Sequence, residues 1–156
     1  NHMFNIVLFE PEIPPNTGNI IRLCSNSNAK LHLIEPLGFD LNEKTLRRAG
    51  LDYIDNRTIN IYKNYDDFLT KNKRINLYGI STKGKVYYHE VKFKENDFFM
   101  FGPETRGLPE TIRGDIGLSK LLRIPMAQNN RSINLANTVS IILFEAWRQN
   151  DFNFGE

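Results

Sequence analysis

Short apolar runs alternate with segments of helical periodicity along the whole sequence. The apolar runs predict strands at residues 4–9, 30–34, 58–62, 75–81, 98–101 and 121–124. The periodic segments predict helices at residues 17–26, 42–48, 66–71 and, the longest, 134–150. Strands that alternate with helices pair in parallel, because each connection crosses back over the sheet. The sequence therefore predicts an α/β fold, a parallel sheet with helices on both faces, which no linker or repeat divides.

The length and composition fit one domain. With 156 residues, of which 40% are hydrophobic, the chain can bury one core of ordinary size. Asn1 and His2, which precede Met3, are interpreted as a cloning remnant, so the expected domain spans residues 3–156. Cys24 is the single cysteine and excludes an intrachain disulfide, and no apolar run approaches the roughly 20 residues of a membrane-spanning helix. We therefore expect a cytoplasmic protein that inserts into no membrane.

The charges give weak information about partners. Twenty Lys and Arg against 18 Asp and Glu leave a net charge of +2, far from that of proteins that grip nucleic acid by charge alone. Two local clusters favour RNA contact: the adjacent Arg47 and Arg48, and a segment that interleaves bases with aromatic rings. This segment contains Lys83, Lys85, Tyr87, Tyr88, His89 and Lys92. An exposed strand edge on which lysines discourage aggregation explains the second cluster equally well.

The strand predicted at 98–101 runs into a loop with one carboxylate between two glycines. Gly102 at the strand end lets a ligand approach the backbone, and Gly107 permits a positive φ before Leu108 and Pro109 restart a helix. Ligands of parallel sheets bind beyond the carboxyl ends of the strands. We expect the strand ends at 80–82, 102 and 124–126 to converge on such a site, although an ordinary strand-to-helix turn also fits the loop.

Other ligand motifs fail on inspection. Residues 79–86 match a phosphate-binding P-loop except at Val86, which stands where Ser or Thr would bind magnesium. Residues 87–91 that follow read as a strand rather than the required helix, so we reject this motif. His32 and His89 lie far apart, and one cysteine builds no thiolate cluster, so we expect no metal site. Each histidine is better explained as a surface residue or a hydrogen-bonded core residue.

Three polar segments occur in a characteristic order. The first is residues 16–22 (NTGNIIR), the second residues 101–108 (FGPETRGL), and the third residues 124–126 (IPM) with 131–137 (RSINLAN). They resemble the three motifs of the SPOUT superfamily of RNA methyltransferases. Flanking residues 10–15, 47–53 and 145–149 resemble its small single-domain members, which methylate the ribose 2′-oxygen of the wobble nucleotide of certain tRNAs.

This resemblance implies a fold, a cofactor and a cofactor site. The fold would be SPOUT-type, with a deep C-terminal trefoil knot that holds S-adenosylmethionine without a metal. The adenosine part of the cofactor would contact backbone groups of the strand ends and lie between two apolar side chains. The implied residues are Ile80, Gly102, Ile124 and Ser132 for the backbone contacts, and Met126 and Leu135 for the walls.

The resemblance also implies which residues serve methyl transfer. Arg22 takes the place of the family's catalytic arginine, and because a guanidinium stays protonated, it suits a phosphate clamp better than a general base. Glu104 completes the candidate catalytic set together with Asn16, Ser132 and Asn134, and these three neutral side chains suit positioning by hydrogen bonds. Glu104 has three possible roles: accepting a proton, binding the target nucleotide or pairing with an arginine. Asn134 is equally well explained as the N-cap of the last helix.

The family pairs as homodimers that build each active site from both chains, and we expect the same here. A stripe at helical spacing in the last helix supports this, although core packing explains it as well. Its residues are Leu135, Val139, Ile142, Leu143, Ala146 and Trp147. The expected activity is 2′-O-methylation of cytidine or uridine 34 of tRNA. The alternatives are another tRNA or ribosomal RNA position, and a non-catalytic RNA-binding protein.

Overall fold

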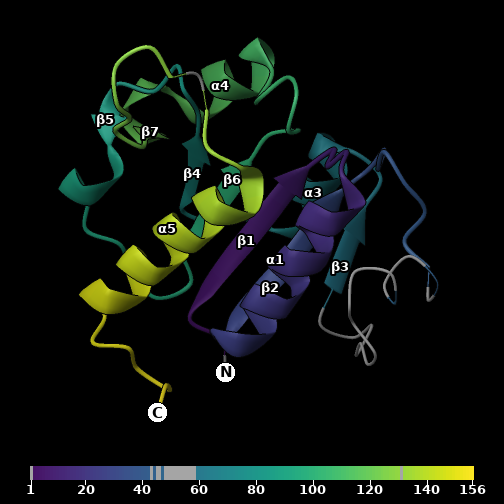
Figure 1. Ribbon diagram of the computed structural model, residues 1–156, viewed down its shortest axis with the longest axis horizontal. Helices are drawn as coiled ribbons and strands as arrows, with labels where there is room; N and C mark the ends of the chain where they lie inside the picture. Colours follow the sequence, from purple (N-terminus) through teal and green to yellow (C-terminus); the bar gives the residue numbers. More distant parts are fainter. Residues whose placement is uncertain (1, 43, 45–46, 48–58, 131) are drawn as a thin grey trace.

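The structure is a computed structural model that describes residues 2–42, 44, 47, 59–130 and 132–156 (Figure 1). The strands are β1 (Phe4–Phe9), β2 (Ala29–Ile34), β3 (Ile59–Tyr62), β4 (Leu77–Ile80), β5 (Val86–Tyr87), β6 (Phe98–Phe101) and β7 (Leu121–Arg123). The helices are α1 (Pro14–Asn26), α3 (Tyr65–Lys71), α4 (Glu110–Ile116) and α5 (Leu135–Gln149), with 3₁₀ turns η2 (Tyr88–Glu90) and η3 (Leu118–Lys120). Most of the helix expected at 42–48, including Arg48, the segment 49–53 and the first residue of the strand expected at 58–62, lies outside the described residues.

The strands form one parallel sheet. Its order is β3-β2-β1-β6-β4-β7-β5, and every strand pairing is parallel. Helices α1 and α5 pack on one face, while α3 and α4 pack on the other (Figure 1). The predicted α/β architecture is confirmed; the trefoil knot stays a prediction.

The central strand β1 shows why the sheet is covered twice. Phe4, Ile6 and Leu8 belong to the core under α1 and α5, whereas Val7 and Phe9 belong to the core under α3 and α4. Alternate residues of a strand point to opposite faces, so a strand buried on both faces reads as a continuous apolar run. This run made residues 4–9 predictable to the residue.

Several element bounds differ from the sequence prediction, most of them by one or two residues, and two of the differences have identifiable reasons. Helix α1 begins at Pro14 rather than Thr17, because Pro14 and Pro15 occupy its first turn, where a missing N–H costs nothing. The strand expected at 87–91 ends at Tyr87 and gives way to the turn η2. Residues 79–86 therefore hold β4, a turn and β5 instead of a strand followed by a phosphate-binding helix, which agrees with rejecting the P-loop.

The apolar stripe of α5 belongs to the core of its own chain. Val139, Ile142, Leu143 and Ala146 are fully buried in the cluster beneath α1 and α5, and Leu135 packs against it. Core packing, the alternative explanation of this stripe, therefore accounts for its buried members, while Leu135 is half-buried; the homodimer stays a prediction. No helix in the described part of the chain is long and apolar enough to cross a bilayer.

His32 is a fully hydrogen-bonded core residue, as expected. It is 1% exposed; its Nδ1 lies 2.8 Å from the Tyr62 hydroxyl and its Nε2 2.9 Å from Asn5 Oδ1. An amide oxygen only accepts, so Nε2 carries the proton and Nδ1 accepts from Tyr62. Burial lowers the pKa of His32 from 6.5 to about 3.

This shift predicts a loss of stability in mild acid. Below pH 6.5 the unfolded chain takes up a proton that folded His32 refuses, so the free energy of unfolding falls as the pH drops toward 3. We expect a slope of up to about 1 kcal/mol per pH unit, measured by urea unfolding between pH 6.5 and 5, where carboxylates contribute little. His32→Gln should flatten this slope whatever its own stability, and exposed His89→Gln should leave it unchanged. An equal slope in wild type and His32→Gln would contradict the assignment.

Candidate active site

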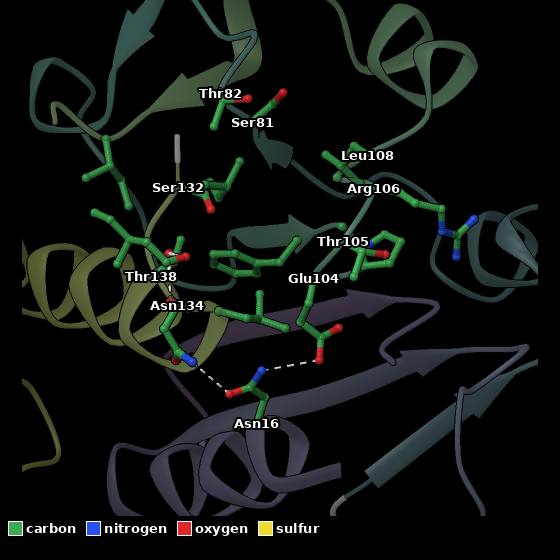
Figure 2. Close-up of a pocket in the computed structure, with 18 of the residues that line it drawn as sticks. Asn16, Ser81, Thr82, Glu104, Thr105, Arg106, Leu108, Ser132, Asn134 and Thr138 are labelled. Atoms are coloured by element: carbon green, nitrogen blue, oxygen red, sulfur yellow. Dashed lines mark hydrogen bonds between the residues drawn. The ribbon is translucent and has the colours of Figure 1, made fainter. Parts of the chain in front are cut away.

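A cavity of about 590 Å³ opens at the carboxyl ends of three strands (Figure 2). Ile80 at the end of β4, Gly102 after β6 and Ile124 after β7 all line it, and the first turn of α5 closes one side with Leu135. The predicted convergence of these strand ends is confirmed. A cavity of this size suits a small-molecule ligand.

The cavity collects most of the candidate residues. Its lining includes Asn16, Ile80, Gly102, Glu104, Ile124, Ser132, Asn134 and Leu135. Met126, expected as an apolar wall, is not among the lining residues; Ile13, Phe101 and Ile133 supply apolar surface instead. Arg22 is not among them either.

Arg22 lies on the exposed surface of α1. Six residues separate it from Asn16, which lines the cavity, and at about 100° per residue the two side chains point to different sides of the helix. The cavity of a single chain therefore contains the positioning candidates without the candidate arginine.

A hydrogen-bonded chain joins the three motif segments. Asn134 Nδ2 donates to Asn16 Oδ1 at 3.1 Å, and Asn16 Nδ2 donates to Glu104 Oε2 at 3.3 Å (Figure 2). Asn134 also caps α5, since its Oδ1 accepts from the N–H groups of Ala136 and Asn137. The expected N-cap is confirmed, and the same residue also lines the cavity; its part in methyl transfer stays a prediction.

The Glu104 carboxylate holds the start of α1. Its Oε1 accepts from the Glu12 N–H at 2.9 Å and its Oε2 from the Ile13 N–H at 2.7 Å. No side chain caps α1 at Ile13, and prolines follow, so a carboxylate here satisfies free donors and complements the positive end of the helix dipole. With these bonds and that from Asn16, Glu104 acts as a positioning residue, a role that differs from the three considered from sequence.

The carboxylate of Glu12, in the loop after β1, accepts hydrogen bonds from the loop after β6. Glu12 Oε1 accepts from the backbone N–H of Thr105 at 2.9 Å and from its hydroxyl at 2.7 Å. The bond from the Thr105 backbone is the main cause that lowers the pKa of Glu12. Arg106 adds an exposed ion pair with Glu10 at 3.2 Å, which contributes little. The loops after β1 and β6 are therefore cross-linked by reciprocal carboxylates.

Gly102 is required by its own loop. A Cβ at this position would stand 2.2 Å from the Leu108 nitrogen and 2.3 Å from the Gly107 carbonyl carbon. A side chain here would displace the backbone of residues 107–108, which is a second reason for glycine beside the approach of a ligand. Gly107 has a φ of +70°, which confirms the predicted left-handed turn.

Three cations of the lining, Lys83, Arg106 and Arg113, were not among the site residues expected from sequence. Arg113 on α4 has a buried Nε without a hydrogen-bond partner, and Lys83 follows β4. No local pattern singles out Arg113, because its position depends on how α4 packs. The unsatisfied Nε–H makes this wall suited to a ligand with an acceptor. Within the described residues, no group of three or more His, Cys, Asp or Glu is placed to hold a metal ion.

Comparison with known proteins matches this arrangement to one family. The model of the SpoU rRNA Methylase family matches residues 3–144, which include all three motif segments and the cavity. The chain belongs to the SpoU methylase family.

Relatives within and around the family agree over most of the chain. A tRNA (cytidine(34)-2′-O)-methyltransferase of Saccharophagus degradans is 55% identical over 150 residues, 96% of this chain and 97% of that protein. A solved structure on 2′-OH methylation of C/U34 on tRNA has a TM-score of 0.88 at 39% identity, covering 97% of this chain and 92% of that one. An AdoMet-bound rRNA methyltransferase from Sinorhizobium meliloti has a TM-score of 0.78 at 26% identity, over 94% of this chain and 56% of that one.

The hydrogen bonds of Glu104 in this SpoU-family site predict a loss of stability on substitution. Glu104→Gln replaces one acceptor oxygen by an NH₂ group, which must then face an N–H donor. We expect the free energy of unfolding in urea to fall by about 1–3 kcal/mol. Glu110→Gln, on the exposed first turn of α4, is the matched control and should change it by less than about 0.5 kcal/mol. Equal free energies of unfolding for the two variants would show that the Glu104 carboxylate does not stabilise the start of α1.

Proposed function

We propose that this chain transfers the methyl group of S-adenosylmethionine to the ribose 2′-oxygen of the wobble nucleotide, cytidine or uridine 34, of tRNA. The observation that carries the proposal is the meeting of the three motif segments, through Asn134, Asn16 and Glu104, at one cavity. The similarity to a tRNA (cytidine(34)-2′-O)-methyltransferase over 97% of that protein supports the substrate. We treat residues 3–156 as a single cytoplasmic domain.

The cavity fits S-adenosylmethionine. Its volume suits a ligand of this size, the strand ends line it with Ile80, Gly102 and Ile124, and the buried Arg113 Nε–H lacks an acceptor. A structural neighbour carries AdoMet. Bound there, the cofactor would supply a methyl group activated on a sulfonium; the sulfur would leave with the bonding electron pair as the demethylated product, and the proton of the ribose hydroxyl would pass to water.

The residues of this chain orient the reaction. Asn16, Glu104 and Asn134 hold the cavity wall through their hydrogen bonds, and Ser132 adds a hydroxyl to it. Arg22 clamps a phosphate of the RNA, so that the ribose hydroxyl points at the sulfonium. Alignment is the main contribution that such a site makes to an in-line transfer.

The position of Arg22 supports an active site built from two chains. It lies outside the cavity of its own chain, so in a homodimer it would serve the cavity of the partner. The buried residues of the α5 stripe are not available for pairing, but Phe144 on the same helix is 42% exposed, and its ring centroid lies 5.6 Å from that of the buried Trp147. The exposed Phe144 ring supports a dimer in which α5 takes part.

Another RNA position is the second candidate. The AdoMet-bound rRNA methyltransferase shares the fold, but the chain covers 56% of that enzyme against 97% of the tRNA relative. This difference in coverage favours the wobble nucleotide.

Nucleoside mapping tests the proposal. Purified protein is incubated with S-adenosylmethionine and tRNA from cells that lack the gene, and the tRNA is digested and analysed by mass spectrometry. We expect 2′-O-methylation at position 34 in the treated sample alone. Methylation at another position or of ribosomal RNA would replace the proposed substrate, and no methylation of either would refute the enzyme.

Cofactor binding should depend on the Gly102 backbone. We expect calorimetry to detect S-adenosylmethionine or its demethylated product in the presence of chelator, because backbone groups rather than a metal hold it. Gly102→Ala should reduce this affinity at least about ten-fold, since the 2.2 Å collision displaces the loop at 107–108. Gly114→Ala, whose Cβ meets no atom within 4 Å, is the matched control and should bind normally. Binding that chelator abolishes would contradict the site.

Arg22→Ala should bind the cofactor normally, but its rate of methyl transfer should fall by about 100-fold or more. The reason is that the Arg22 guanidinium is proposed to contact the RNA and not the cofactor in the cavity. Arg74→Ala, an exposed arginine at the amino end of β4, is the control and should retain activity.

Mixing two inactive variants tests the shared site. Refolded together, Arg22→Ala and Gly102→Ala should form heterodimers with one intact site and recover about a quarter of wild-type activity. A monomer by sedimentation, or no recovery despite proven exchange, would defeat the shared site.

A further inference from the structure

The edge strand β5 carries an exposed basic and aromatic surface, which we name the β5 edge: Lys83, Lys85, Tyr87, His89 and Arg123. β5 is the last strand of the sheet and pairs only with β7 among the described strands, as Figure 1 shows. The register places Tyr87 directly beside Arg123. Residues distant in sequence thus form one surface.

The ring of Tyr87 and the guanidinium of Arg123 share a face of the sheet. Their strand neighbours Val86 and Leu122 pack in the core beneath α1 and α5. Adjacent residues of a strand alternate between faces, so Tyr87 and Arg123 point to the opposite side. There Tyr87 is 41% exposed, and Arg123 is also exposed.

Tyr87 forms a flat aromatic platform with His89. Their ring centroids lie 5.9 Å apart and their planes differ by 20°, so the rings are stacked. Both side chains are exposed. Exposed, pre-stacked rings beside a guanidinium are the arrangement on which unpaired nucleobases stack in single-stranded RNA complexes.

The cations of the β5 edge are available for phosphate. In the part of the chain that the structure describes, Lys83, Lys85 and Arg123 form no ion pair, and all three are exposed. Glu90 is the single acidic residue between positions 83 and 92. The local charge is therefore strongly positive in a protein whose net charge is only +2.

The β5 edge is continuous with the active-site cavity. Lys83 itself lines the cavity, as does Ile124, the residue after Arg123. The Ser81 N–H donates to the Leu122 carbonyl at 3.0 Å, which fixes the turn that carries Lys83 against β7. A strand of RNA with one ribose in the cavity thus meets this surface with its neighbouring nucleotides.

We propose that the β5 edge binds the single-stranded nucleotides that flank the methylated one, with a base stacked on Tyr87 and phosphates held by Lys85 and Arg123. The inference rests on the proposed function, because it assumes that the cavity binds a ribose of an RNA substrate. The alternative is that the lysines only keep an edge strand from aggregating. That explanation gives no role to the stacked rings or to Arg123, which lies on the inner neighbour β7.

The test compares variants in binding and turnover. Binding of a fluorescent tRNA anticodon stem-loop is measured by anisotropy at several salt concentrations, and KM and kcat are measured with tRNA. Tyr87→Ala should weaken binding and raise KM about ten-fold with kcat nearly unchanged, and Tyr87→Phe should restore both. Arg123→Gln should weaken binding and lower the salt slope by about 0.7. Lys73→Gln, exposed at the amino end of β4, should change neither.

Each outcome decides the inference. Unchanged affinity and KM in Tyr87→Ala and Arg123→Gln, with normal S-adenosylmethionine binding, would overturn it and leave the proposed function standing. If Lys85→Gln aggregates but binds RNA as tightly as wild type, the inference is overturned, and the lysines only keep the edge strand from aggregating. If wild type binds the stem-loop but methylates no RNA, the proposed function fails, and the affinities of the variants still decide whether this surface holds the strand.

Discussion

The carboxylate of Glu104 is the contact on which the site depends. It accepts hydrogen bonds from the Glu12 and Ile13 backbones and from Asn16, which in turn accepts from Asn134. These groups come from the loops after β1 and β6 and from the start of α5, which the sheet alone brings only near one another. Buried or half-buried donors without this acceptor would carry a desolvation cost, so the network specifies one arrangement of the three loops.

The sequence predicted the sheet better than the loops. Residues 4–9 and 98–101 were predictable to the residue because strands buried on both faces read as unbroken apolar runs. Asn134 was readable as an N-cap because capping depends on neighbouring residues only. β5 was missed as a two-residue strand, since its pairing with β7 depends on a register that no local pattern shows.

The sequence predicted many residues of the site but not the contacts that explain their positions. Motif resemblance named most of the lining, but the reason for Gly102 lies in a collision with the Gly107–Leu108 backbone, and the Arg113 contribution lies in how α4 packs. The stripe of α5 shows the same limit, because helical spacing is identical for a core face and for an interface. Burial of Val139 and Ile142 in the chain's own core decided between them.

Helix α1 carries one cavity residue at its start and the candidate arginine farther along. The first turn is held by Glu104 through the Ile13 N–H, and Arg22 follows Asn16 by about 9 Å along the axis. An α-helix behaves as a rigid unit over this length. The loop with Glu104, which lines the cavity, therefore also determines the direction of the Arg22 side chain, which points away from the cavity. In the proposed dimer, the reach of Arg22 toward the partner would thus be set by a contact made inside its own chain.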